Sequence, residues 1–153
     1  MILVLGAAAQ GKREFARMYL MGGIAAEREV FWTDGEAASW EKFTESVACC
    51  HFHLFIKRLL SGEDSLGPGL PDWVREWRKQ GDAEEKFPSL LADYLFAMEP
   101  DRILITNEIG CGIVPLDPFQ RYYREQTGRV CCELAKRSEQ VWRVSCGLGQ
   151  RIK

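Results

Sequence analysis

Residues 1–13 read MILVLGAAAQGKR and decide how the chain begins its fold. The apolar run Met1–Leu5 is typical of a buried parallel strand, and the apolar spacing over Arg13–Met21 predicts a helix. The small-residue loop between them matches G-x-x-x-x-G-K, whose backbone N–H groups cradle phosphates where a helix begins. We therefore expect nucleotide contacts from Gly6, Ala7, Ala8, Ala9, Gln10, Gly11, Lys12 and Arg13.

The last two residues of this loop carry its charges. Lys12 is expected to reach the β- and γ-phosphates of the nucleotide and to act in catalysis. Arg13 stands where the full pattern has a serine or threonine, whose hydroxyl helps to hold Mg²⁺. With arginine there, Mg²⁺ would need a water in place of the lost ligand. Two interpretations stay open: the guanidinium points to solvent, or it contacts phosphate and supplies the charge of the metal. The sequence identifies no metal ligands.

Beyond the loop, strand-like and helix-like segments alternate. The helix expected over residues 121–137 is predicted to be interrupted or bent near Gly128. The alternation predicts an α/β fold, with a mostly parallel sheet flanked by helices and a C-terminal antiparallel hairpin. A length of 153 residues fits a single domain over residues 1–153. Strands are expected at 29–33, 47–55 (running into a helix through Leu60), 102–107, 141–146 and 150–153.

Composition and charge narrow the class of protein. The formal net charge is -2, and hydrophobic residues make up 46% of the chain. A basic excess usually accompanies nucleic-acid or membrane-surface binding, so neither partner is expected. No apolar run has the length of a membrane span, and the N-terminus lacks the basic region of a signal peptide. A cytoplasmic location is expected.

Six cysteines occur, and none of them forms a C-x-x-C pair. Zinc sites usually pair their ligands across such short spacers. The cysteines are therefore predicted to be reduced and mostly buried, with a structural disulfide or a metal site as the alternative.

The last third of the chain carries a run of short motifs. These are TNEIG at 106–110, GIVP at 112–115, YRE at 123–125, GR at 128–129 and GLGQRIK at 147–153. With MILVLG and GK at the start, the run resembles the adenosylcobinamide kinase / adenosylcobinamide-phosphate guanylyltransferase family of cobalamin biosynthesis. The resemblance implies a RecA-like P-loop fold, GTP or ATP as phosphoryl donor and adenosylcobinamide as acceptor. It also implies GMP transfer through a histidine, and a homo-oligomer, namely a trimer.

The middle of the chain departs from this family. Members of the family carry a histidine motif between the helix after the phosphate loop and a second strand that ends in an acidic residue. In this chain no histidine occurs before His51. The family's acidic residue falls, by spacing, at about Cys50. His51 and His53 are candidates to replace the missing histidine. If both lay in a strand, their side chains would point to the same face. Glu108 ends the strand 102–107 and is the surviving acidic candidate for catalysis, through water-held Mg²⁺ or by orienting an acceptor hydroxyl. Its other interpretation is that Asn107-Glu108 shapes the following loop.

Two main functions follow from these features. One is phosphoryl transfer from GTP or ATP to adenosylcobinamide, with the guanylyltransferase step in doubt. The other is a non-catalytic relative that binds a nucleotide or a corrinoid, which Arg13, Cys50 and the missing histidine element favour. A third possible function is phosphoryl transfer by the same fold to a different acceptor.

Overall fold

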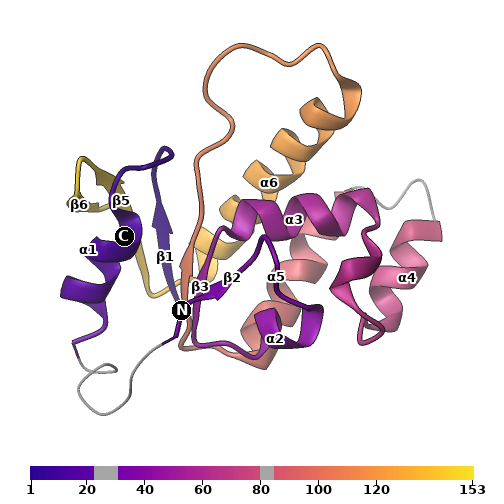
Figure 1. Cartoon of the computed structure of the whole chain (residues 1–153), viewed down its shortest axis with the longest axis horizontal. Coiled ribbons are helices and arrows are strands. Elements are labelled where there is room, and N and C mark those ends of the chain that lie inside the picture. Colours follow the sequence, from indigo (N-terminus) through magenta and orange to yellow (C-terminus); the bar gives the residue numbers. More distant parts are fainter. Residues whose placement is uncertain (23–30, 80–84) are drawn as a thin grey trace.

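A computed structural model describes residues 1–22, 31–79 and 85–153 of the chain. Within these ranges, six strands form one sheet in the order β2-β3-β4-β1-β5-β6 (Figure 1). All neighbouring strands are parallel except β5 and β6, which form an antiparallel hairpin at the edge. The strands are β1 (Ile2–Leu5), β2 (Thr33–Asp34), β3 (Ala48–Cys50), β4 (Ile103–Ile105), β5 (Gln140–Ser145) and β6 (Leu148–Arg151).

Helices cover both faces of this sheet. Successive side chains of a strand point to opposite faces, and here both faces carry apolar side chains that need to be covered. On one face Val4, Ile105 and Val144 pack against α1 and the π-helical turn that continues it. On the other face Leu3, Cys49 and Leu104 join the core formed by the remaining helices (Figure 1). The helices are α1 (Lys12–Phe15) with the π-helical turn Ala16–Leu20, α2 (Trp40–Thr44), α3 (Phe52–Ser61), the 3₁₀ turn Asp64–Leu66, α4 (Asp72–Lys79), α5 (Phe87–Met98) and α6 (Pro118–Arg137).

The predicted α/β, RecA-like P-loop architecture, with a mostly parallel sheet and a C-terminal hairpin, is confirmed. The boundaries of the second strand were wrong: β2 begins at Thr33, and residues 29–30 of the expected strand lie outside the described residues. The strand expected over 47–55 is also shorter, because β3 ends at Cys50 and α3 begins at Phe52.

The helix α6 corrects another expectation, because it runs without interruption through Gly128. Asp117 caps it by accepting a hydrogen bond from the Gln120 N–H at 2.7 Å, and Pro118 fits its first turn. A glycine inside a helix costs only about 1 kcal/mol relative to alanine. The buried side chains of Val130 and Leu134, packed in the core, outweigh that cost.

All six cysteines are free thiols, as expected, but they are not mostly buried. Cys49 and Cys50 are buried in β3, and Cys131 is half-buried. Three others are exposed: Cys111, Cys132 and Cys146. In the part of the chain that the structure describes, no helix combines the length and the apolar character needed to cross a membrane.

The parallel pairing decides where functional residues can meet. Because β1, β2, β3 and β4 run in one direction, their carboxyl ends lie along one edge of the sheet, where such folds place their ligand-binding residues. At this edge stand the loop after β1, Asp34 at the end of β2, Cys50-His51 after β3 and Asn107-Glu108 after β4.

Candidate functional site

The loop between β1 and α1 has the backbone of a phosphate cradle. Gly6, Ala9 and Gly11 have positive φ angles of 153°, 57° and 77°. A Cβ on Gly6 would lie 2.3 Å from the carbonyl oxygen of Val144 in β5, so only glycine fits there. The loop therefore curls tightly against the sheet and leads directly into the N-terminus of α1, as in phosphate-binding loops.

The hairpin β5–β6 fastens this loop from the side. The Gly147 N–H donates to the carbonyl oxygen of Gln10 at 2.9 Å. The Cys146 N–H donates to the Gln10 side-chain oxygen at 2.7 Å. Gln10 thus connects the phosphate loop to the hairpin turn.

An open cavity of about 450 Å³ lies over the loop. Its lining combines the loop and the start of α1 with the ends of β3 and β4, namely residues 8–14, Cys50, His51, Ile105 and Asn107. A volume of this size suits a small-molecule ligand. The structure thus brings most of the predicted loop residues to one cavity, and it adds Cys50, His51 and Asn107 to them.

Lys12 is buried at the base of the cavity, beneath the loop. Its ammonium donates to the carbonyl oxygens of Gly6 at 3.0 Å and Ala7 at 2.6 Å, and to Asn107 Oδ1 at 2.6 Å. Burial lowers the Lys12 pKa, and the charge of Glu108 opposes that shift. All three ammonium donors are thus used, so binding a phosphate requires Lys12 to give up at least one of them.

Asn107 in turn contacts His53, 3.1 Å from amide Nδ2 to His53 Nε2. Burial, together with the charges of His51 and Lys12, lowers the His53 pKa to about 4. The neutral imidazole can accept the amide hydrogen, which leaves Asn107 Oδ1 facing Lys12. His53 is therefore a support for Asn107. The expectation that His51 and His53 share a strand face was wrong, because α3 begins between them at Phe52.

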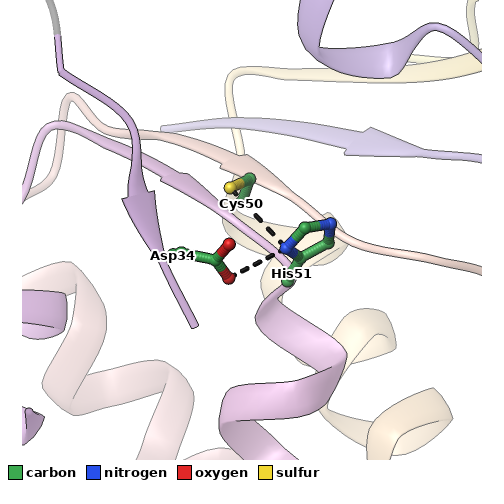
Figure 2. Close-up of side chains that lie close together, drawn as sticks. All are labelled: Asp34, Cys50 and His51. Atoms are coloured by element: carbon green, nitrogen blue, oxygen red, sulfur yellow. Dashed lines mark hydrogen bonds and ion pairs between the residues drawn. The ribbon is translucent and has the colours of Figure 1, made fainter. Parts of the chain in front are cut away.

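At the other side of the cavity, Asp34, Cys50 and His51 form a cluster (Figure 2). His51 Nδ1 lies 2.8 Å from Asp34 Oδ1 and 4.0 Å from Cys50 Sγ. One ligand atom from each of the three residues lies within 4.8 Å of the other two. His51 adopts the left-handed conformation, with φ of 52°, which turns it from the end of β3 into α3.

Charges around this cluster set its protonation. Burial disfavours ionised Asp34, but the Glu36 amide, His51 and the charge of Arg13 outweigh it and lower the Asp34 pKa. Burial and the charge of Asp34 raise the Cys50 pKa, which Arg13 partly offsets. Cys50 is therefore a protonated thiol in the free protein. Arg13 is exposed and lines the cavity, and its charge acts on both groups, so both interpretations of its side chain stay open.

Glu108 takes a different position from the one expected of a catalytic acid. Its carboxylate lies 3.3 Å from the Arg143 guanidinium of β5, and its backbone N–H donates to the Gly6 carbonyl at 3.1 Å. Asn107, not Glu108, lines the cavity. These contacts join Asn107-Glu108 to the phosphate loop and to β5, rather than to the loop that follows them in the sequence.

The side chains at this edge do not fit Mg²⁺, which prefers oxygen ligands. Position 13 offers a guanidinium and position 50 a thiol. Asp34 supplies a carboxylate, whereas that of Glu108 is paired with Arg143. Sequence reasoning placed Asp34 at the end of the second predicted strand, where such folds bind ligands, but did not select it as a site residue.

The comparisons with known proteins agree with the motifs of the C-terminal part. A family model described as cobinamide kinase / cobinamide phosphate guanyltransferase matches residues 53–152. The bifunctional adenosylcobalamin biosynthesis protein CobU of Salmonella typhimurium strain LT2 is 45% identical over 51 residues, which are 33% of this chain and 28% of that protein. The protein of the same name from Escherichia coli strain K12 matches to the same extent.

The aligned segment thus spans little more than a quarter of these curated relatives. The family model begins at His53, so the phosphate loop and the cluster of Asp34, Cys50 and His51 precede the matched residues. The match nevertheless covers well over half of the 153 residues. The chain belongs to the cobinamide kinase / cobinamide phosphate guanyltransferase family.

Proposed function

We propose that this chain binds GTP or ATP over residues 6–13 and transfers the terminal phosphoryl group to adenosylcobinamide. The observation that carries the proposal is the strand–loop–helix unit with its cavity of about 450 Å³ and Lys12 at its base. Phosphoryl transfer is catalysed chiefly by positioning and by charge. Loop amides and Lys12 would supply both, and Arg13 would add a positive charge at the cavity wall.

A role in cobalamin biosynthesis rests on the family, whose curated members here are named for adenosylcobalamin biosynthesis. The choice of adenosylcobinamide as the acceptor of the phosphoryl group goes beyond that role and is part of our proposal. The loop from 110 to 117 offers apolar surface for a large ligand, since Ile113 and Leu116 are 94% and 96% exposed. Arg124 holds this loop through the carbonyl oxygens of Ile113, Gly110 and Cys111.

The guanylyltransferase step is not included in the proposal. The sequence has two histidines, and His53 is 6% exposed beneath Asn107. The other, His51, directs Nδ1 to Asp34. Incubation with GTP labelled at the α-phosphate should therefore leave no acid-labile label on the protein, and a stoichiometric phosphoramidate at either histidine would contradict this.

A second candidate function is nucleotide or corrinoid binding without catalysis. Arg13 and Cys50 favour it, because each stands where the family pattern supplies a metal-binding oxygen. The two functions separate in one assay, transfer of labelled γ-phosphate to adenosylcobinamide. Binding of GTP without transfer would select the non-catalytic function.

The nucleotide site is tested by calorimetric titration of GTP and ATP into wild type and Lys12→Ala. The variant should lose detectable binding. Lys136→Ala, which removes an exposed lysine on α6, is the matched control and should bind as wild type does. Unchanged affinity in Lys12→Ala would remove the phosphate-loop proposal.

We also propose a homo-oligomer, a trimer as the family resemblance implies. Sedimentation equilibrium tests it. A cytoplasmic location is proposed as well, and six free thiols suit a reducing compartment.

A further inference from the structure

We propose that Asp34, Cys50 and His51 bind a divalent transition metal ion of the zinc class at the mouth of the phosphate-loop cavity. This inference concerns residues that precede the stretch matched by the family model, and it does not depend on phosphoryl transfer.

The identities of the three donors point to this class of metal. A thiolate, an imidazole and a carboxylate are ligands that Zn²⁺ and Co²⁺ accept together, whereas Mg²⁺ requires oxygen. Three protein ligands plus one open position is the pattern of zinc sites that also bind a small molecule.

Two of the three separations between the ligand atoms need only small adjustments to close around an ion, and the third, between Asp34 and Cys50, is at most 4.8 Å. With the bond lengths of a tetrahedral zinc site, an imidazole nitrogen and a carboxylate oxygen lie about 3.3 Å apart, and nitrogen and sulfur about 3.6 Å apart. The corresponding separations are 2.8 Å between His51 Nδ1 and Asp34 Oδ1, and 4.0 Å between His51 Nδ1 and Cys50 Sγ. Each therefore changes by about half an ångström, because the metal replaces the Nδ1 proton and draws in the sulfur.

The backbone holds the two strand ends close enough for this contact. The Gly35 N–H donates to the Cys50 carbonyl oxygen at 2.9 Å. A Cβ on Gly35 would lie 2.6 Å from the His51 carbonyl oxygen, so a larger residue would push β2 away from β3. Gly35 thus permits the approach of Asp34 to His51.

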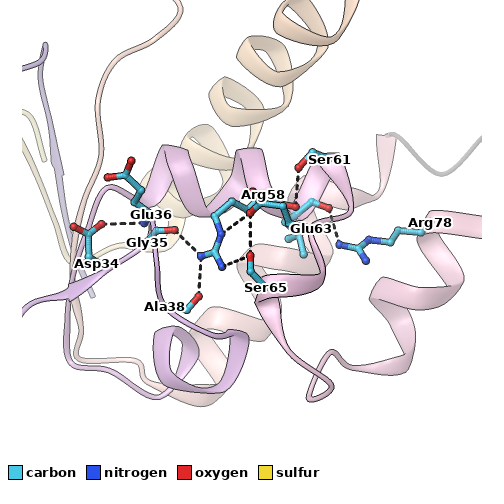
Figure 3. A network of polar contacts seen from close by, with 10 residues as sticks. Asp34, Gly35, Glu36, Ala38, Arg58, Ser61, Glu63, Ser65 and Arg78 are labelled. Atoms are coloured by element: carbon cyan, nitrogen blue, oxygen red, sulfur yellow. Dashed lines mark hydrogen bonds and ion pairs between the residues drawn. The ribbon is translucent and has the colours of Figure 1, made fainter.

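Asp34 is also held by a polar network that reaches into α3 (Figure 3). The Glu36 N–H donates to Asp34 Oδ1 at 2.9 Å. The buried Arg58 donates to the carbonyl oxygens of Gly35 at 3.1 Å and Ala38 at 2.8 Å, and pairs with Glu63 at 2.7 Å. Such outer contacts orient metal ligands and strengthen binding. Asp34 Oδ1 both accepts this amide hydrogen and faces His51; it has two lone pairs, so it can keep the amide while it binds the metal.

The charge balance suits zinc at this place despite Arg13. A divalent ion with one thiolate and one carboxylate has no net charge, so a guanidinium nearby is tolerated. A magnesium ion held by Asp34 alone would keep a positive charge beside Arg13.

The fourth position of the ion would face the cavity, because Cys50 and His51 line it together with the phosphate loop. A water or a phosphate oxygen fits there as a ligand.

The test is a titration of the full-length, reduced protein with CoCl₂ in the absence of nucleotide. One equivalent of cobalt should bind and give a near-ultraviolet thiolate-to-cobalt charge-transfer band with strong tetrahedral visible bands. ZnCl₂ should displace it, and MgCl₂ at equal concentration should not. Asp34→Asn and His51→Asn should each weaken cobalt binding roughly 100-fold or more, and Cys50→Ser should also remove the charge-transfer band.

Cys132→Ser, at an exposed thiol on α6, is the matched control and should leave affinity and spectrum unchanged. Since Cys50 is buried, its variant is checked by circular dichroism. Asp34 and His51 are half-exposed, so their variants test the site independently of core packing. Absence of the charge-transfer band at saturating cobalt, its persistence in Cys50→Ser, or displacement of cobalt by magnesium would each overturn the proposal.

Discussion

The ammonium of Lys12 and the side-chain oxygen of Asn107 lie 2.6 Å apart and connect the phosphate loop to the end of β4. This contact predicts how Asn107 affects nucleotide binding. In Asn107→Asp a carboxylate would pair with Lys12 and repel the incoming phosphates. Two like charges at about 4 Å and an effective dielectric near 20 interact by about 4 kcal/mol, so we expect the affinity for GTP to fall by roughly 100-fold or more, measured by calorimetry.

Asn107→Ala separates charge from structure in this prediction. It removes the hydrogen bond without adding a charge, so GTP affinity should fall less than in Asn107→Asp. The free energy of unfolding in urea should drop by about 1–3 kcal/mol, because a buried charged donor loses its partner. Equal loss of affinity in both variants would refute the electrostatic explanation.

Arg13 is predicted to replace part of the charge that a magnesium ion supplies in other phosphate loops. Wild-type affinity for GTP should therefore change little between EDTA and millimolar Mg²⁺. Arg13→Ser restores the usual hydroxyl and should make binding magnesium-dependent. Strong magnesium dependence in the wild type, measured in the same titrations, would count against charge replacement and leave the family assignment intact.

The folded protein should lose stability as the pH falls from about 6.5 towards 4, because of His53. Its pKa is lowered from 6.5 to about 4 in the folded state, so in this window the unfolded chain binds more protons. The loss from this group amounts to at most about 3 kcal/mol. His53→Gln keeps an acceptor for Asn107 and cannot titrate, so its urea-derived stability should fall less steeply over that window. Parallel curves for the two proteins would contradict the buried, neutral state of His53.

Two glycines should respond to alanine in opposite ways. Gly6→Ala should strongly destabilise the protein and abolish nucleotide binding, because the new Cβ meets the Val144 carbonyl oxygen. Gly128→Ala meets nothing within 4 Å and should stabilise the protein by up to about 1 kcal/mol, since alanine favours the helix. Thermal unfolding of both variants checks this pair, and destabilisation by Gly128→Ala would indicate that α6 needs the glycine.

Sequence reasoning identified the elements with strong local patterns. The strand before the phosphate loop, the strand around Ile103 and the hairpin around Gly147 are all present, although β4 is shorter than the predicted 102–107 and β6 begins two residues before the predicted 150–153. It failed where the outcome depends on distant packing. β2 is two residues long and held by β3, and the glycine in α6 is outweighed by side chains that pack on the core.

The candidate site was predicted only in part, because some of its contacts also depend on packing between segments that are distant in the sequence. The loop 6–13 was found from its local pattern, but the pairing of β2 with β3 alone brings Asp34 to His51, and no local pattern encodes that. The burial of Lys12 on loop carbonyls was also unforeseen. Nucleotide binding by residues 6–13, catalysis by Lys12 and Glu108, and a single domain over 1–153 stay predictions.

The central place of β1 has a consequence for how the chain is made. Ile2 pairs with Ile103 on one side and with Gln140 on the other, so β1 leaves the ribosome well before either of its partner strands. At synthesis rates of about 5–20 residues per second, its apolar side chains stay unpaired for several seconds at least. Nascent chains should therefore engage a chaperone until β4 and β5 emerge, and the phosphate loop should be among the last parts to acquire its shape.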